Sequence, residues 1–336
     1  MKIFFFSTVF APSVGGIERQ TETLCTQFTE LGHEVRLATL TPGDGAFPFE
    51  VIRRPGLRQF LDLLRWCDVH VQANVSLKYA AARAAAPRKT IYQHNNVYQR
   101  DDGMLTVPDR LKQLVSRTSR GVSVSTYVAR KTGCPTVIMN AYDDAVFKAS
   151  KPWDQRAHDI AFLGRLVSQK GCDTLLQALV RLGARGLRPS VSIIGDGADR
   201  AQLAAFVEGA GLAGQVRFAG VLTGDRLAAT LNDHRFLAVP SRYEEPFGNV
   251  ALEGLACGCV PIVSRRGGLV DAIGPHGFTF ENGDDRALAE VLEATLSRPD
   301  AAVAKLANVQ DHLAARTARR VAEQYLDVFT TLAAKP

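Results

Sequence analysis

The sequence predicts an α/β protein built from two doubly wound parallel sheets. Short apolar segments typical of buried strands alternate with amphipathic segments typical of helices along the chain. This alternation starts at residue 2 and starts again at residue 158, after the turn-rich, charged stretch 148–157. The 336 residues also exceed the roughly 250–300 that one hydrophobic core usually holds. We therefore expect two domains.

The first domain is predicted over residues 1–150. The helix at 16–32 shows helical spacing of apolar residues and ends at Gly32. Further helices are expected at 77–86 and 108–120. Buried strands are expected at 2–9, 33–40, 51–55, 68–74, 89–95, 121–125 and 135–140.

The second domain is predicted over residues 151–315. We expect its strands at 158–166, 190–197, 215–220, 236–241, 260–264 and 278–282, and its helices at 171–185, 199–210, 224–233 and 248–257. The Ala-rich segment 302–333 is expected to be helical. Its end, 316–336, is predicted as a C-terminal helix that packs back toward the first domain.

The composition argues against a membrane-spanning, secreted, disulfide-bonded or zinc-binding protein. No run of about 18 apolar residues suggests a membrane-spanning helix. The apolar start reads as a first strand rather than a signal peptide, because it is short, aromatic and followed by Pro12 and Gly15-Gly16. The six cysteines form no CxxC pair, so we expect buried thiols in a reducing cytoplasm rather than disulfides or zinc.

The positive charge is concentrated in the first half. Residues 1–150 carry 19 Lys and Arg against 13 Asp and Glu, whereas 151–336 carry 21 of each. Within 51–132 the count is 15 against 5. Solvated helices would explain this excess, and so would a surface for anionic lipid or a phosphorylated acceptor. No aromatic-basic platform or nucleic-acid motif is present, so we expect no nucleic-acid partner. The segments 56–66 and 108–117 mix apolar and basic residues, as interfacial helices and ordinary core-facing helices both do.

The segment 241–264 carries the strongest chemical signal. Glu245 and Glu253 stand eight positions apart around a turn at Phe247-Gly248-Asn249. A helix beginning near Gly248 would direct its first backbone N–H groups at an anion. Acids near a helix start can also be explained by the helix dipole alone. Carboxylates beside such an anion site favour a ligand with hydroxyls and phosphates, such as a sugar nucleotide.

Basic and glycine-rich loops follow other predicted strands. Arg165 and Lys170 lie five residues apart after the strand at 158–166 and could grip two phosphates, unless they form an exposed basic loop. Gly16 lies in a Gly-Gly turn between the first strand and first helix. Gly195 belongs to a turn that fails the dinucleotide pattern, because Arg200 occupies the third glycine position. His94 ends a predicted strand, where we expect it to face a cleft.

Two segments resemble the retaining glycosyltransferases of family 4. The run E-P-F-G-x-x-x-x-E spans Glu245 to Glu253, with Gly254 in place of the usual Ala, and GRL-x-x-QKG spans 164–171. The resemblance implies the GT-B fold, with two facing Rossmann-like domains and a C-terminal helix. It also implies transfer of a sugar from a nucleoside-diphosphate sugar, such as a UDP-sugar or GDP-sugar, to a hydroxyl acceptor.

The same resemblance implies roles for individual residues. Arg165 and Lys170 would stabilise the leaving diphosphate, Glu245 would hold sugar hydroxyls, and Glu253 would accept from the ribose. The amides of Phe247, Gly248 and Asn249 would lie near the donor. Gly16 would contact the diphosphate or acceptor, Gly195 would lie near the nucleobase, and His94 near the transferred sugar. Asn140 and Asp143 would order the interdomain loop.

The expected activity is therefore metal-independent glycosyl transfer without a cofactor, of a hexosyl or N-acetylhexosaminyl group. Saccharide or lipid-linked acceptors of lipopolysaccharide, exopolysaccharide or glycolipid synthesis fit this activity. The expected location is the cytoplasm, with an anionic membrane surface as a further partner. Two alternatives stay open: a non-catalytic sugar-nucleotide-binding protein, which would need the same residues, and a sugar-nucleotide epimerase, which would need further acid/base residues.

Overall fold

The computed structural model describes residues 1–13, 15–84, 90–99 and 104–333, and it divides into two compact units. Unit 1 comprises residues 1–141 and 315–336, and unit 2 comprises residues 142–314. The two doubly wound parallel sheets predicted from the sequence are confirmed, one in each unit. The units divide near Tyr142, a few residues before the stretch 148–157.

Unit 1 is built on six parallel strands in the order β3-β2-β1-β4-β5-β6. The helices are α1 (Gly16–Glu30), α2 (Leu57–Trp66), α3 (Ala80–Ala84), α4 (Val107–Thr118), α5 (Thr126–Thr132) and α14 (Ala318–Ala333). The strands are β1 (Lys2–Ser7), β2 (Glu34–Thr39), β3 (Glu50–Arg53), β4 (Val69–Ala73), β5 (Thr90–His94) and β6 (Gly121–Ser123).

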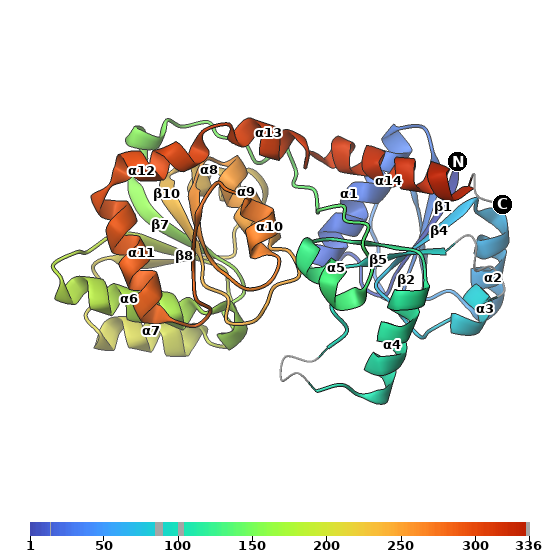
Figure 1. Cartoon of the computed structure of the whole chain (residues 1–336), viewed down its shortest axis with the longest axis horizontal. Helices are drawn as coiled ribbons and strands as arrows, with labels where there is room; N and C mark the ends of the chain where they lie inside the picture. The colour runs from blue at the N-terminus through green and yellow to red at the C-terminus, as the bar shows by residue number, and fades with distance from the viewer. Residues whose placement is uncertain (14, 85–89, 100–103, 334–336) are drawn as a thin grey trace. The chain divides into compact units, whose positions relative to one another are not determined.

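Alternating side chains of β1 divide between the two faces of this sheet. Ile3 and Phe5 are buried under α1 and α14, which lie side by side in Figure 1 and pack through Phe28 and Phe329. Phe4 and Phe6 are buried on the opposite face, against residues of α2 and α3. Helix α14 therefore belongs to the core of unit 1, although it comes last in the chain.

Unit 2 repeats this architecture with the order β12-β11-β10-β7-β8-β9. The strands are β7 (His158–Leu163), β8 (Val191–Ile194), β9 (Val216–Gly220), β10 (His234–Val239), β11 (Val260–Ser264) and β12 (Phe278–Phe280). The helices are α6 (Cys172–Ala184), α7 (Arg200–Gly209), α8 (Gly224–Asn232), α9 (Asn249–Ala256), α10 (Leu269–Ile273), α11 (Asp285–Ser297), α12 (Pro299–Val303) and α13 (Val309–Ala314).

Two predicted elements differ from the structure. The strand expected at 135–140 is wrong: Val137 forms one isolated bridge with Ser123, and the chain then leaves the edge of the sheet. The segment 302–333, expected to be helical, consists of several pieces: α12 runs into a short 3₁₀ turn at Ala304–Leu306, and α13 and α14 follow after short breaks. The six cysteines are free and buried, as expected.

No helix within the described ranges is long and apolar enough to cross a membrane. Across residues 1–13, 15–84, 90–99 and 104–333, no group of three or more His, Cys, Asp or Glu side chains could hold a metal ion.

Candidate functional site

The candidate site of unit 2 lies at the carboxyl ends of β7 and β10. These strands are neighbours in the sheet, yet β8 and β9 extend from β7 in one direction while β11 and β12 extend from β10 in the other. The strand order therefore reverses between β7 and β10, and the carboxyl ends of strands at such a reversal are where doubly wound sheets usually bind ligands. Arg165 and Lys170 follow β7, and Glu245 follows β10, so the sheet order brings the predicted residues to one place.

Close backbone approach brings the loop after β7 against the loop after β10. Gly171 has a φ of +67°, and a Cβ at this position would overlap the Pro240 carbonyl. Only glycine tolerates both conditions at low cost. The Arg242 N–H donates to the Gln169 carbonyl at 2.9 Å and ties the two loops together.

Lys170 and Glu245 form a largely buried ion pair at this junction. Lys170 Nζ donates to Glu245 Oε1 at 2.9 Å, and their side chains are 18% and 7% exposed. Ser241 Oγ donates to the same carboxylate oxygen. Two donors from different loops thus fix the orientation of the Glu245 carboxylate.

Tyr243 completes the surroundings of the Lys170 ammonium. Its hydroxyl lies 3.2 Å from Lys170 Nζ, and its ring centroid lies 5.1 Å from the same atom. Burial alone would lower the pKa of Lys170, but the Glu245 carboxylate and Tyr243 outweigh it, so the pKa is raised above its ordinary value. Lys170 therefore stays a cation at neutral pH.

Arg165 is the exposed member of this cluster. Burial raises the pKa of Tyr243, and the positive charges of Lys170 and Arg165 partly oppose that rise. Arg165 and Lys170 thus supply two positive charges at one strand end, one exposed and one held by a carboxylate. Such a pair suits a doubly charged phosphate group.

Helix α9 starts directly after the ion pair in sequence. Its N-cap, Gly248, has a φ of +113°, and a Cβ there would overlap the Leu269 side chain. Phe247 is buried, and Asn249 is the first helical residue. The first N–H groups of the helix have no partner within the helix. They come directly after a turn at Gly248, where any larger residue would strain the backbone.

Glu253 lies inside α9 and is 5% exposed. The next residue, Gly254, packs so closely that a Cβ would overlap Leu237 of β10. This contact packs α9 against the sheet and keeps Glu253 buried.

Gly267 and Gly268, which neither sequence motif includes, support the backbone of Glu245. Gly268 N–H donates to the Glu245 carbonyl at 2.6 Å, and Gly267 bridges the same residue. A Cβ at Gly268 would overlap the Pro246 carbonyl. The signal in the sequence was a Gly-Gly pair just after a buried strand, the same pattern noted at Gly15-Gly16.

Gly195 has a structural task close to Arg165. Its φ is +138°, and a Cβ would overlap the Gly164 carbonyl. The Leu166 N–H donates to the Asp196 carbonyl at 2.9 Å. The loop after β8 thus supports the loop that carries Arg165 and Lys170.

The two remaining predicted residues belong to unit 1. Gly16 is the first residue of α1, after Gly15 as N-cap. His94 ends β5 but is fully buried rather than open to solvent, and its Nδ1 lies 2.8 Å from the Tyr98 hydroxyl. Burial lowers the pKa of His94 to about 4, so its ring is neutral near pH 7.

Comparisons with known proteins bear on the family and the fold of the chain. The profile of the family described as "Glycosyl transferases group 1" matches residues 143–310. The 2-deoxystreptamine glucosyltransferase of Streptomyces kanamyceticus is 31% identical over 157 residues, 46% of this chain and 40% of that protein. Glycogen synthase of Mycobacterium tuberculosis is 33% identical over 171 residues, 50% of this chain and 41% of that protein. The matched segments thus span well under half of these relatives.

Solved structures resemble the whole chain. HepE of Anabaena, solved in complex with UDP, superimposes with a TM-score of 0.82 at 18% identity, over 98% of this chain and 100% of HepE. WaaG, a glycosyltransferase involved in lipopolysaccharide biosynthesis, superimposes with a TM-score of 0.71 at 17% identity, over 98% and 99% of the two chains. The GT-B fold expected from the sequence is therefore confirmed. With the family profile covering half of its residues, this chain belongs to the group 1 glycosyltransferases.

Proposed function

We propose that this protein transfers a sugar from a nucleoside-diphosphate sugar to a hydroxyl acceptor, with retention of the anomeric configuration. The observation that carries the proposal is the ion pair of Lys170 and Glu245 at the switch point of the unit 2 sheet. It places a fixed cation and a fixed carboxylate beside the exposed Arg165 and the start of α9. A ligand rich in both phosphates and hydroxyls suits these groups.

Arg165 and Lys170 stabilise the negative charge that builds on the diphosphate as the anomeric bond breaks. Their cations take the place of the metal that other sugar transferases use, so the proposed reaction is metal-independent. The acceptor hydroxyl attacks on the face that the diphosphate leaves, and the departing phosphate takes its proton. The fixed orientation of Glu245 suits hydrogen bonds to sugar hydroxyls, and the buried Glu253 suits the ribose.

The donor site can be tested by measuring the turnover of the variants Lys170→Ala and Glu253→Ala. Each should lose at least about 10²-fold in donor hydrolysis and transfer, the scale for removing one preorganised electrostatic contact. Lys148→Ala is the matched control, because Lys148 is an exposed lysine of the same unit. Near-normal turnover in either site variant would refute the assignment.

The donor base is proposed to be uracil, with guanine as the second choice. HepE has been solved with UDP and with UDP-glucose, which supports this order. A ligand that binds only the folded protein raises its apparent stability, by about 2.7 kcal/mol at a concentration one hundred times its Kd. Of UDP, GDP and ADP, UDP should therefore raise the melting temperature of the protein most. A larger shift with ADP would overturn the choice.

Hexosyl or N-acetylhexosaminyl transfer in lipopolysaccharide, exopolysaccharide or glycolipid synthesis is the proposed context. The role of WaaG in lipopolysaccharide biosynthesis and the excess of basic residues in unit 1 support it. We place the acceptor on unit 1 and propose peripheral contact with an anionic membrane surface on the cytoplasmic side. The anomeric configuration of the product, read by proton NMR, tests retention directly.

A further inference from the structure

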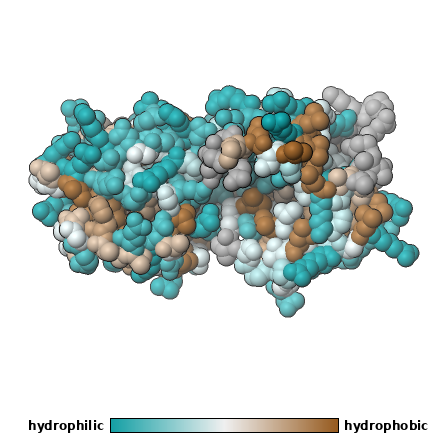
Figure 2. All heavy atoms as spheres, turned by 90° about the horizontal axis from the view of Figure 1, so that it is seen from below, coloured by the Kyte–Doolittle hydropathy of each residue, from teal (hydrophilic) through white to brown (hydrophobic). Residues whose placement is uncertain are grey.

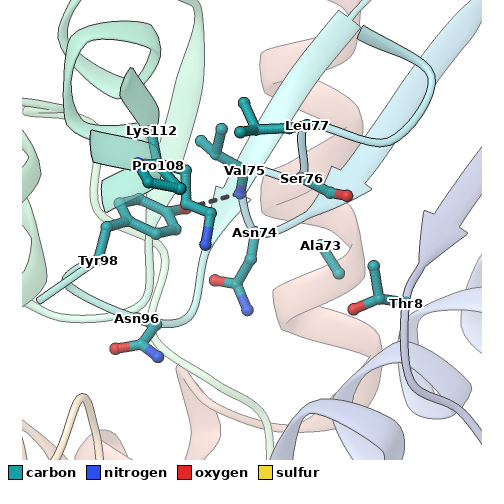
Figure 3. A pocket seen from close by; sticks show the side chains of 10 residues that line it. All are labelled: Thr8, Ala73, Asn74, Val75, Ser76, Leu77, Asn96, Tyr98, Pro108 and Lys112. Carbon is teal, nitrogen blue, oxygen red and sulfur yellow. Dashed lines mark hydrogen bonds between the residues drawn. The ribbon is translucent and has the colours of Figure 1, made fainter. Parts of the chain in front are cut away.

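The carboxyl ends of the strands differ in charge between the two units. In unit 1 a pocket of about 450 Å³ lies at the ends of β1 and β4, and of the ten described residues that line it, Lys112 alone is charged (Figure 3). Its wall is joined by neutral groups, because the Tyr98 hydroxyl accepts a hydrogen bond from the Val75 N–H at 2.9 Å. In unit 2, by contrast, the Lys170 ammonium and the Glu245 carboxylate lie 2.9 Å apart at the ends of β7 and β10.

Lys170 needs outside contacts to stay in one position. A lysine ammonium ends a flexible four-carbon stem. The residue lies in a 3₁₀ turn of three residues, Ser168–Lys170, between β7 and α6. Such short turns have poorer hydrogen-bond geometry than an α-helix, so the turn alone holds the lysine weakly. The two residues that follow Ser241 after β10, Arg242 and Tyr243, contact this turn and the ammonium.

Arg242 spans the turn with its whole guanidinium. Nη1 donates to Ser168 Oγ at 3.3 Å, Nε donates to Thr174 Oγ1 at 3.3 Å, and Nη2 pairs with the Asp173 carboxylate. The first of these partners lies in the turn itself, and the other two lie in the first turn of α6. The contacts of Arg242 therefore fall on both sides of Lys170 in the sequence.

The side chain of Arg242 is held by protein groups although it lies near the surface. Charged side chains at a protein surface are mostly surrounded by water. Figure 2 shows hydrophilic residues over much of one face of the protein. The Arg242 side chain is 39% exposed, yet each of its three guanidinium nitrogens has a protein partner. A planar guanidinium can serve several acceptors at fixed angles, which suits the joining of two loops.

Tyr243 acts on the ammonium rather than on the turn. An ammonium has three N–H donors. Lys170 Nζ donates one to Glu245 Oε1 at 2.9 Å and one to the Tyr243 hydroxyl at 3.2 Å. Among the described residues, these are the two acceptors that Lys170 Nζ reaches, so its third N–H is available for a phosphate oxygen. The Tyr243 ring, with its centroid 5.1 Å from Nζ, adds attraction for the cation.

We propose that Arg242 and Tyr243 are positioning residues for Lys170: Arg242 fixes the turn that carries the lysine, and Tyr243 fixes the ammonium so that one N–H points at the diphosphate of the donor. Both act through Lys170 and not by touching the donor themselves. The proposal rests on the proposed glycosyl transfer, because it takes the diphosphate as the ligand of Lys170.

The first test is a double-mutant cycle on the affinity for UDP. Arg242→Gln and Tyr243→Phe should each raise the Kd for UDP by about tenfold, the scale of one hydrogen bond to a charged group. In the Lys170→Ala background, either substitution should change the Kd by less than about twofold, because the residue through which it acts is gone. Equal factors in the two backgrounds, or an unchanged Kd in the single variants, would overturn the proposal.

Arg286→Gln and Tyr79→Phe are the matched controls. Each removes the same chemical group as one site variant, but away from the turn. The Arg286 side chain is 74% exposed and pairs with Glu290 within α11, and the Tyr79 hydroxyl donates to the Pro55 carbonyl in unit 1. The Kd for UDP should stay within about twofold of the wild-type value in both controls. Controls that weaken UDP as much as the site variants would show a general effect of lost contacts and would refute a role specific to Lys170.

Hydrogen exchange tests the position of the turn without any ligand. The Lys170 N–H donates to the Val167 carbonyl at 2.9 Å, and its exchange with solvent reports how often the turn opens. Peptides that cover residues 167–171 should exchange at least about fivefold faster in Arg242→Gln than in the wild type. Tyr243→Phe should exchange at the wild-type rate, because its hydroxyl holds the ammonium and not the turn.

The two measurements separate this proposal from the proposed function. If the wild-type chain binds none of UDP, GDP and ADP, the proposed function fails and the diphosphate is not the ligand of Lys170. Faster exchange of the turn in Arg242→Gln would then still support the positioning of Lys170. If UDP binds the wild type but the turn exchanges at the same rate in Arg242→Gln, the proposed function stands and Arg242 does not position Lys170.

Discussion

Lys170 and Glu245 stand 75 positions apart in the chain and share one hydrogen bond at 2.9 Å. Neither charge would be favourable alone in a site this buried, because each would lose hydration without compensation. Together with the Ser241 hydroxyl they hold each other in one orientation. The donor site therefore contains a cation and a carboxylate that are already in place before any ligand arrives, which is the condition for electrostatic preorganisation.

Replacing Glu245 by Gln tests this mutual dependence. The substitution keeps the shape of the side chain but leaves the Lys170 cation without its carboxylate, so the free energy of unfolding should fall by about 1–3 kcal/mol. Urea unfolding at pH 7 measures the change. In the control Glu290→Gln, whose carboxylate is 55% exposed and pairs with Arg286, the loss should stay below about 0.5 kcal/mol. Equal losses of unfolding free energy in the two variants would show that Lys170 does not depend on the Glu245 carboxylate.

The sequence could single out residues of the candidate site but not their partners. Arg165, Lys170, Glu245 and Glu253 stand in segments whose letters suggest phosphate and hydroxyl chemistry. The ion pair of Lys170 with Glu245 depends on β7 and β10 being neighbours, and no local pattern states which strands are neighbours. The same holds for the support of Glu245 by Gly268.

The start of α9 has little steric freedom. Gly248 combines a φ of +113° with no room for a Cβ beside Leu269. Gly248→Ala should therefore lower the free energy of unfolding by about 1–3 kcal/mol, from backbone strain and steric overlap together. Thermal melting of the purified variant measures the loss.

Gly183→Ala is the matched control for this prediction. Gly183 lies in α6 with open space around it, so alanine should be neutral or stabilise the protein by up to about 1 kcal/mol. If both substitutions have the same sign and size, the special geometry of Gly248 does not govern stability.

Most of the missed helices are short, and one is not. Helices α5 and α10 have seven and five residues, too few for a helical period to stand out. Helix α11 is longer, and it was missed although Asp284 accepts a hydrogen bond from the Ala287 N–H as its N-cap, a signal visible in the sequence. The apolar run at 135–140 resembles a strand, but its chain leaves the sheet after one bridge.

At the scale of the whole molecule, both units use one strand order, with the first and fourth strands adjacent. The sequence showed the restart of the pattern at 158 but could not give this order. Right-handed crossovers allow several parallel arrangements of the same elements. Each unit consequently has its own switch point, occupied by the Lys170 and Glu245 pair in unit 2 and by the pocket near Asn74 in unit 1.

Buried histidines in both units make the stability of the whole chain sensitive to acid. Burial lowers the pKa of His70 to about 3, and the pKa values of His94 and His234 to about 4. In the unfolded chain a histidine has a pKa of about 6.5, so between that pH and about 4 the unfolded state binds more protons. The stabilising effect of the neutral rings is full above pH 6.5 and is lost as the pH falls.

When the pH falls from 7 to 5, each of these histidines should lower the free energy of unfolding by about 1–2 kcal/mol. Urea unfolding followed by circular dichroism should therefore show a steep loss over this range. His234→Gln removes one titrating ring from unit 2, so its stability should depend less steeply on pH even if its stability at pH 7 is lower. The slope, rather than the absolute stability, separates proton linkage from lost packing. A wild-type stability that stays flat between pH 7 and pH 5 would show that the rings can protonate without unfolding either unit.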